Sequence, residues 1–226
     1  MHKQNTVRSI NNFRLFLKSH SYTKYDDECI YRFDQANQLL FIVGIENERK
    51  TKVFFECIPL VSLSFFETNG APQGGCWSTL HIMVKNRKSF QNTSLEEQLS
   101  FFCHHIFPSL HALSSTGAVL NFNKKMSTWL NLTSVNGSPK TTFAYLSVNR
   151  VDEAIQYCNH NIQHFTSILA SSPNSNHTRM KACIDSFSKI KSILMDHPTY
   201  FNREIENTII QNEKHLITYL EKCKDL

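Results

Sequence analysis

The spacing of hydrophobic residues changes near position 93, and no other feature limits the possible folds of the chain as strongly. Before this position, short apolar runs of strand length alternate with polar turns, as in antiparallel sheets. After it, apolar residues recur at every third or fourth position, as on one face of an α-helix. We therefore predict an α+β protein, with residues 1–92 as a helix plus an antiparallel β-sheet and residues 93–226 as an α-helical part packed on it. A single continuous domain fits the same pattern.

The N-terminal part is expected to begin with a helix over residues 5–19, because its apolar residues share one face. We predict a four-stranded antiparallel sheet after it, with strands over residues 29–33, 38–46, 51–63 and 77–84. Apolar residues occur on both faces of the last strand, which indicates a sheet that is covered on each side.

The C-terminal part should begin at Ser94, which forms the pattern of a capping box with Glu97. We expect this first helix to end before Pro108, because the residue before a proline disfavours helical geometry. A second helix is expected over residues 109–125, although Gly117 weakens its pattern.

Residues 140–169 are best interpreted as a helical hairpin, and a strand over residues 141–148 is the alternative. The sequence therefore leaves open whether residues 129–148 are helix or strand. Two long amphipathic helices on either side of His197-Pro198 are predicted to end the bundle as an antiparallel helix hairpin.

Composition indicates a folded protein, because 41% of the residues are hydrophobic and 12% are aromatic. The formal charge of +5 is spread along the chain, whereas nucleic-acid-binding domains concentrate basic residues on one face. The seven cysteines include no Cys-x-x-Cys pair, so we expect small buried side chains and no disulfide framework or zinc knuckle. No cofactor is expected.

The chain shows no pattern of a secretory or membrane protein. Its first residues are polar, and no apolar run approaches the ~20 residues that cross a bilayer. We therefore expect a cytoplasmic protein without a membrane partner.

A glycine-rich loop is the first candidate site, because functional residues often lie on loops that a rigid scaffold holds. It matches neither common phosphate-binding pattern. The binding-loop candidates are Gly70, Gly74, Gly75, Cys76 and Trp77. An enzymatic alternative uses Cys76 with His81 or His104, but Cys76 and His81 would lie ~17 Å apart on a regular strand.

Two histidine pairs are weaker candidates. His160 and His164 have the spacing of helical metal ligands, but the metalloprotease pattern requires a glutamate where this chain has Asn161. His104 and His111 would share a face only if their helix continued through Pro108, which we do not expect.

The order of these elements resembles an uncharacterised bacterial family of domains with an N-terminal helix, an antiparallel sheet and a helical C-terminal part. The resemblance covers about residues 5–170 and implies no catalytic residues; some members are similar to immunity or interaction proteins. Residues 140–169 also resemble one hairpin of a tetratricopeptide repeat, with Asn149-Arg150 where a small residue is usual. The residues that carry the family resemblance are Phe13 to Leu17, Tyr31 and Phe33, the run from Leu39 to Ile45, Phe107-Pro108-Ser109-Leu110, Ala144-Tyr145-Leu146 and Val151-Asp152-Glu153-Ala154.

The leading functional hypothesis is a non-enzymatic protein-interaction module of the immunity or antitoxin kind, whose partner is another protein. It depends on three absences from the sequence: there are no paired carboxylates at motif spacing, there is no metal motif, and there is no nucleotide-binding loop. The alternatives are an enzyme with a Cys/His site near the Gly70–Gly75 loop and a weak nucleic-acid-binding protein. The oligomeric state stays open.

Overall fold

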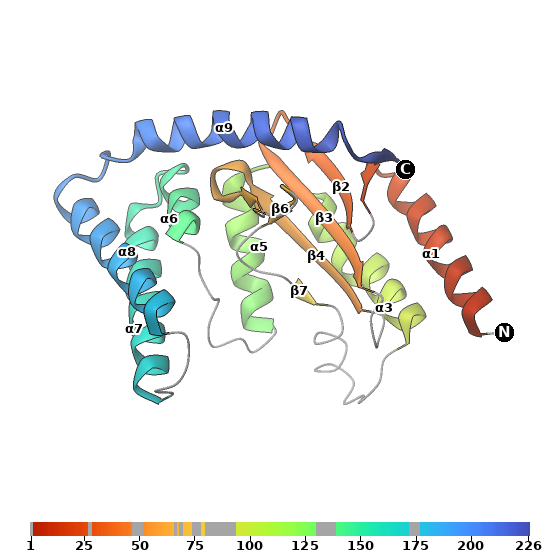
Figure 1. The fold of residues 1–226 in the computed structure, drawn as a ribbon, viewed down its shortest axis with the longest axis horizontal. Helices are drawn as coiled ribbons and strands as arrows, with labels where there is room; N and C mark the ends of the chain where they lie inside the picture. The colour runs from red at the N-terminus through yellow and green to blue at the C-terminus, as the bar shows by residue number, and fades with distance from the viewer. Residues whose placement is uncertain are drawn as a thin grey trace.

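The computed structural model describes residues 2–26, 29–46, 52–65, 67, 70–73, 78–79, 94–129, 139–171 and 177–226. These residues confirm the predicted α+β class: an N-terminal helix, an antiparallel sheet and a helical C-terminal part (Figure 1).

A six-stranded antiparallel sheet with the order β7-β4-β3-β2-β1-β8 forms the centre of the described structure. Its long strands are β2 (Cys29–Asp34), β3 (Leu39–Glu46) and β4 (Lys52–Pro59). The short strands at its margins are β1 (Lys24–Tyr25), β7 (Ser78–Thr79) and β8 (Lys224–Asp225), while β5 (Ser64–Phe65) and β6 (Pro72–Gln73) pair separately.

Each of the four predicted strands is represented in this sheet, and β7 is the described part of the last one. The prediction missed β1 and β8, because a strand of two residues is too short to show an alternating pattern. The pairing of β8 with β1 brings the C-terminal residues to the sheet, where the Leu226 N–H donates to the Thr23 carbonyl at 3.0 Å.

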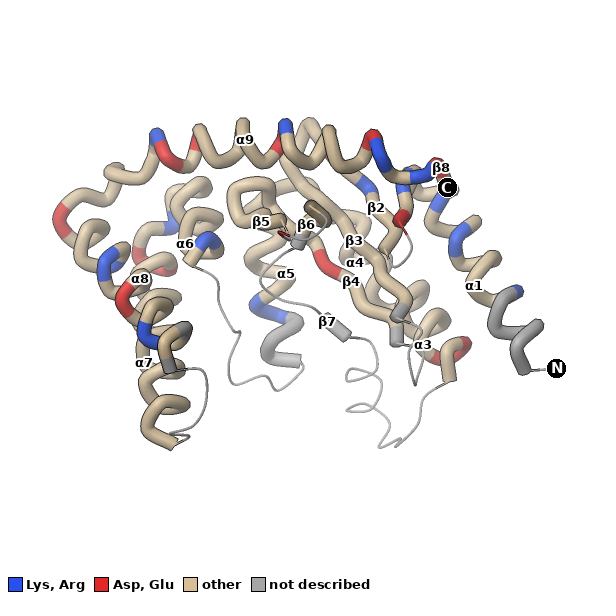
Figure 2. Tube along the Cα trace, in the orientation of Figure 1, with Lys and Arg blue, Asp and Glu red and all other residues tan. Residues whose placement is uncertain are grey.

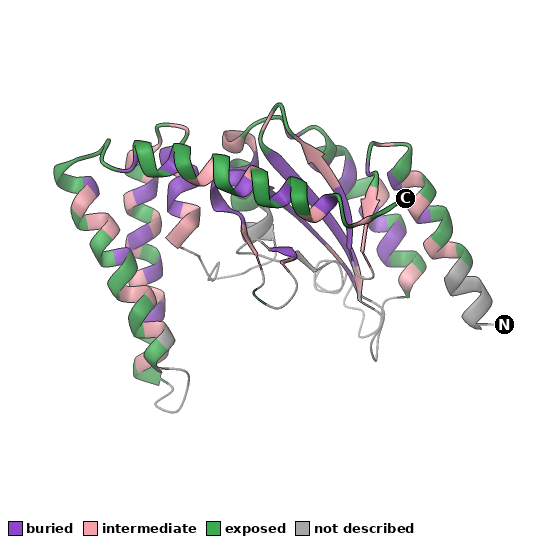
Figure 3. Ribbon diagram, turned by 45° about the horizontal axis from the view of Figure 1, so that its top comes forward, coloured by how far each residue is buried: buried purple, intermediate pink, exposed green. Residues whose placement is uncertain are grey.

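Both faces of the sheet are covered, as the sequence predicted. On β3, Leu39, Phe41 and Val43 point into a core beneath α1 (His2–Lys18), α3 (Leu95–Phe101), α4 (Phe107–His111) and α5 (Thr116–Trp129). The alternate residues Leu40 and Ile42 pack against α9 (Asn202–Leu220) on the opposite face. Figure 3 shows buried residues along the strands and on the inner sides of these helices.

The predicted capping box at the start of α3 is confirmed. Ser94 Oγ accepts from the Glu97 N–H at 3.2 Å, and Glu97 Oε2 accepts from the Ser94 N–H at 2.8 Å. The predicted end before Pro108 is wrong, because a π-helix over Phe102–Ile106 (η2) leads directly into α4. Pro108 lies in the first turn of α4, where a missing N–H costs no helical hydrogen bond.

The predicted helical hairpin is formed by α6 (Pro139–Leu146) and α7 (Val151–Ser171). The turn between them contains Asn149 at φ 58°, a conformation that asparagine tolerates better than most residues. The strand alternative for residues 141–148 is therefore wrong, while residues 130–138 lie outside the described residues.

The last two helices pair differently from the expected hairpin. The helix α8 (His177–Asp196) packs along α7, where Phe187 contacts the cluster of Cys158 and Phe165. After α8, α9 crosses the top of the molecule in Figure 1 and reaches the sheet. Leu216 and Leu220 of α9 belong to the core on this sheet face, whereas Ile205 near its start shares a cluster with Leu194 of α8. The sheet therefore supplies the apolar surface for the C-terminal half of α9, which we had assigned to α8.

Hydrophobic contacts join the two predicted parts of the chain. Phe13, Ile30 and Phe55 share one core with Leu99 and Phe102.

Among the described helices, none has both the length and the apolar character needed to cross a membrane.

Candidate functional site

The predicted binding loop falls mainly on residues that the structure does not describe. Gly70 is described and has φ 69°, a conformation that favours glycine. Gly74, Gly75, Cys76, Trp77 and His81 lie outside the described residues, so the loop stays a prediction.

The histidines suggested as ligands or proton carriers do not converge. His104 is exposed, and its Nδ1 lies 2.7 Å from the Ser100 carbonyl in its own helix. His160 is also exposed, whereas partial burial and the neighbouring His160 lower the pKa of His164. In the described part of the chain, no group of three or more His, Cys, Asp or Glu side chains could hold a metal ion.

A row of residues on the outer side of α9 forms a more coherent candidate. We call it the outer stripe; its residues recur at intervals of three and four, opposite the packed residues Ile205, Leu216 and Leu220. Ile210 in this row is 65% exposed and Ile217 is 37% exposed, although both are aliphatic. The outer stripe consists of Arg203, Asn207, Ile210, Lys214, Ile217 and Glu221.

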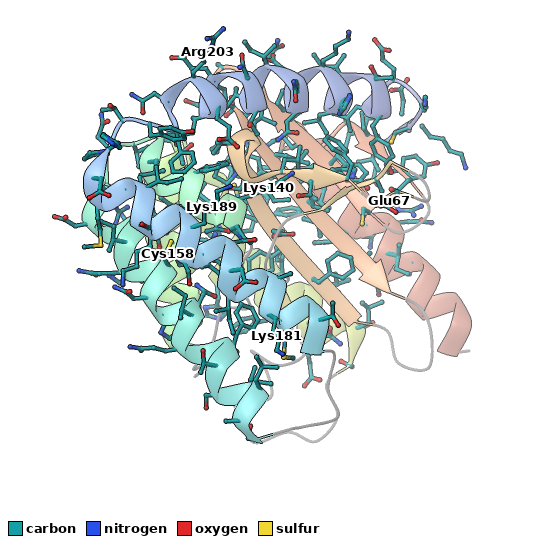
Figure 4. All side chains as sticks on the ribbon, turned by 60° about the vertical axis from the view of Figure 1, so that its left-hand side comes forward. Glu67, Lys140, Cys158, Lys181, Lys189 and Arg203 are labelled. Atoms are coloured by element: carbon teal, nitrogen blue, oxygen red, sulfur yellow. The ribbon has the colours of Figure 1, made fainter. Side chains whose placement is uncertain are left out.

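Two shallow, open hollows between neighbouring side chains lie along the outer stripe, each lined only by residues of α9 and of the turn before it. Charged residues of both signs follow α9 in Figure 2, and in Figure 4 the Arg203 side chain points away from the rest of the molecule. The hollow near the C-terminal end is lined by Ile210, Glu213, Lys214, Ile217, Thr218 and Glu221. The hollow near the N-terminal end is lined by Tyr200, Arg203, Glu204, Asn207, Thr208 and Gln211.

Polar contacts hold α9 in place from its inner side. The buried Asn212 side chain donates through Nδ2 to the carbonyls of Leu60, at 2.6 Å, and Leu63, at 3.1 Å. Near the end of α9, the Tyr219 and Tyr31 hydroxyls both donate to Asp26 Oδ2, each at 2.5 Å. Burial, together with the hydrogen bond to Asp26, raises the pKa of both tyrosines, so both stay protonated donors. The outer stripe therefore belongs to a helix with a fixed orientation.

A second cluster joins three basic side chains from separate elements. His20 follows α1, Arg32 lies on β2 and His111 ends α4. The Arg32 Nη1 atom lies 3.2 Å from His111 Nδ1, and the two imidazole rings meet edge to face with centroids 5.4 Å apart. We call these three residues the basic cluster.

Sequence reasoning missed the basic cluster because its members are far apart along the chain. His111 had been considered with His104, but the structure places it beside His20 and Arg32 instead. No local spacing signals this arrangement, since it depends on how α1 and α4 lie over β2. The outer stripe could have been detected, because Ile210 and Ile217 are seven residues apart and so share one face of the predicted helix.

No protein-family model, curated protein or solved structure matches this chain. The resemblance to a bacterial family therefore stays a prediction.

Proposed function

We propose that this chain is a non-enzymatic protein-interaction module that binds a helix of another protein along the outer stripe of α9. The observation that carries the proposal is the pair Ile210 and Ile217, which remains exposed on the outer side of a helix whose inner side is firmly packed. The bacterial resemblance adds the proposal of a cytoplasmic protein of the immunity or antitoxin kind.

The spacing of the outer stripe suits a helical partner. Ile210 and Ile217 are seven residues apart, so a partner helix lying along α9 can bury both with side chains at its own 3–4 spacing. Burying an aliphatic side chain contributes about 1.5–3 kcal/mol, less whatever part is already covered. The shallow spaces between neighbouring side chains of α9 can accommodate the ridge of side chains on a partner helix.

The charges along the stripe define the orientation of the partner. Glu213 and Glu221 outnumber Lys214 in the C-terminal hollow, so that hollow is acidic. We expect the partner helix to carry aliphatic residues along its centre and a basic residue at the end that meets Glu221. Polar residues around an apolar centre are the usual composition of a transient protein interface.

Site-specific crosslinking tests this proposal. A photo-crosslinking amino acid at position 210 should form a stoichiometric product with one other protein, whereas the same group at position 195 should not. Met195 is the matched control, because it is 65% exposed like Ile210 but lines neither hollow.

The crosslinked partner is then purified and its affinity measured by calorimetry. We expect Ile210→Gln to weaken binding roughly tenfold or more, since 1.4 kcal/mol corresponds to a factor of ten, and Met195→Gln to leave it unchanged. Equal losses for both variants would contradict the proposal. A product that contains only two copies of this chain would also contradict it, because the occupant would then be a second copy.

A further inference from the structure

The basic cluster has an unusual composition for a packed site. Arg32, His20 and His111 meet at the junction of β2, α1 and α4, and Phe107 packs on both imidazoles, with ring centroids 4.7 Å from His20 and 5.2 Å from His111. The Arg32 guanidinium lies over the Phe41 ring at 3.7 Å from its centroid. Aromatic rings therefore fix these basic groups side by side.

Hydrogen-bond geometry defines the protonation of the two histidines. A guanidinium can only donate, so His111 Nδ1 accepts from Arg32 Nη1 and carries no proton. A carbonyl can only accept, so His20 Nδ1 donates to the Phe16 carbonyl at 2.8 Å. His111 is consequently neutral when its bond to Arg32 is formed.

The cluster lacks acceptors for its donors. Within the described residues, Arg32 Nε, Arg32 Nη2 and the hydroxyl of the fully buried Tyr22 have no hydrogen-bond partner. Asp34 lies on the same face of β2 as Arg32, but its carboxylate oxygens accept from the backbone and side-chain nitrogens of Asn37. Arg32 is half-buried, and a cation partly withdrawn from water normally pairs with an anion, since desolvation of an unpaired charge is costly.

We propose that the basic cluster binds a small oxyanion of the sulfate or phosphate class when His111 takes up a proton. Protonated Nδ1 of His111 is a donor, and it then faces the donor Arg32 Nη1 across 3.2 Å. Two donors that face each other repel. An oxygen of the anion that accepts from both nitrogens removes this repulsion. The proton comes from solvent, and the anion enters from the exposed side of His111.

The surroundings of His111 support the proposal that its protonation and the binding of the anion are coupled. Partial burial, Arg32 and His20 together lower the pKa of His111, because each disfavours the imidazolium. The charged and titratable groups on the side of Arg32 are His111, Tyr22, Cys57 and Asp34. Burial raises the pKa of Tyr22 and Cys57, so both stay neutral, and Asp34 is the one carboxylate among them, with its oxygens turned to Asn37. A bound oxyanion would place a negative charge directly beside His111 Nδ1 and Arg32 Nη1 and raise the pKa of His111.

Histidine NMR tests the inference, with inorganic sulfate as the probe because it does not titrate near neutral pH. The Cε1–H signal of His111 is followed against pH in sulfate and in chloride at matched ionic strength. We expect sulfate to raise the pKa of His111, and the sulfate affinity to fall up to about tenfold for each pH unit above that pKa. Inorganic phosphate serves as a second arm.

Two exposed histidines provide the variant and its control. His111→Gln should abolish the pH dependence and weaken sulfate binding at least roughly tenfold, whereas His104→Gln should change neither. Circular dichroism of each variant confirms that the fold is retained. An equal response of His111 to sulfate and chloride, or a sulfate affinity independent of pH, would overturn the inference.

Discussion

The two faces of the sheet are covered in different ways. On one face, several helices contribute rings to a largely aromatic core, in which Phe102 contacts Phe13, Phe55 and Phe107. On the other face, Cys29 and Tyr31 of β2 and aliphatic residues of β3 and β4 meet the single helix α9. We call these the aromatic face and the α9 face.

The difference between the two faces has a functional consequence. A single covering helix packs with one side and leaves its other side exposed, which creates the outer stripe. Because few apolar residues hold α9, polar contacts from Asn212 and Tyr219 supplement them. The α9 face thus combines a modest core with an available surface, whereas the aromatic face is mainly a stabilising core.

Matched core truncations should produce the largest effects in this comparison. Phe102 and Leu216 are both fully buried, one on each face. We expect Phe102→Ala to lower the free energy of unfolding by about 4 kcal/mol and Leu216→Ala by about 3 kcal/mol. The measurement is chemical denaturation followed by circular dichroism. A larger loss for Leu216→Ala would show that the α9 face, not the aromatic face, carries more of the stability.

The polar anchoring of α9 should have the next largest effect. Replacing Asn212 by Ala removes two hydrogen bonds, while the Leu60 carbonyl keeps the bond from the Leu63 N–H and the Leu63 carbonyl keeps the bond from Lys140 Nζ. We expect a loss of about 1 kcal/mol of unfolding free energy. Asn207→Ala is the control, because Asn207 is exposed on the same helix and should change stability by less than about 0.5 kcal/mol. Similar small losses for both variants in denaturation experiments would mean that apolar packing alone holds α9.

The contrast between the faces also explains what the sequence could predict. Apolar residues on both faces of the predicted strand over residues 77–84 indicated a sheet covered on each side, and the Ser94 capping box predicted where α3 begins. These features are local, because a strand or a helix start shows its pattern within a few residues. The helix through Pro108 was missed, since a π-helix has no simple sequence pattern and proline usually follows a break.

Long-range pairing was the part that local patterns could not predict. The apolar side of α9 fits either α8 or a sheet, and the complete fold uses both, because Ile205 packs near Leu194 of α8 and Leu216 packs on the sheet. Likewise, His20, Arg32 and His111 meet because three elements converge on one face. The predicted loop at Gly70 to Gly75 remains a sequence-based candidate, because most of it lies outside the described residues.

The smallest effect should be a pH dependence that belongs to the aromatic face alone. The pKa of His111 lies below its ordinary value of 6.5, because burial, Arg32 and His20 disfavour its charged form. The unfolded chain therefore binds this proton more readily, so His111 stabilises the fold fully above pH 6.5 and less as pH falls through the lowered pKa.

The measurement is the denaturation midpoint in chloride between about pH 5 and 7.5. His111→Gln should flatten the decline at low pH, while His215→Gln on α9 should leave it unchanged. His215 is exposed and its ring lies 5.5 Å from that of Phe65, so it resembles His111 in having an aromatic neighbour but contacts neither Arg32 nor His20. An identical decline in the wild type and His111→Gln would show that the two faces do not differ in their response to protons.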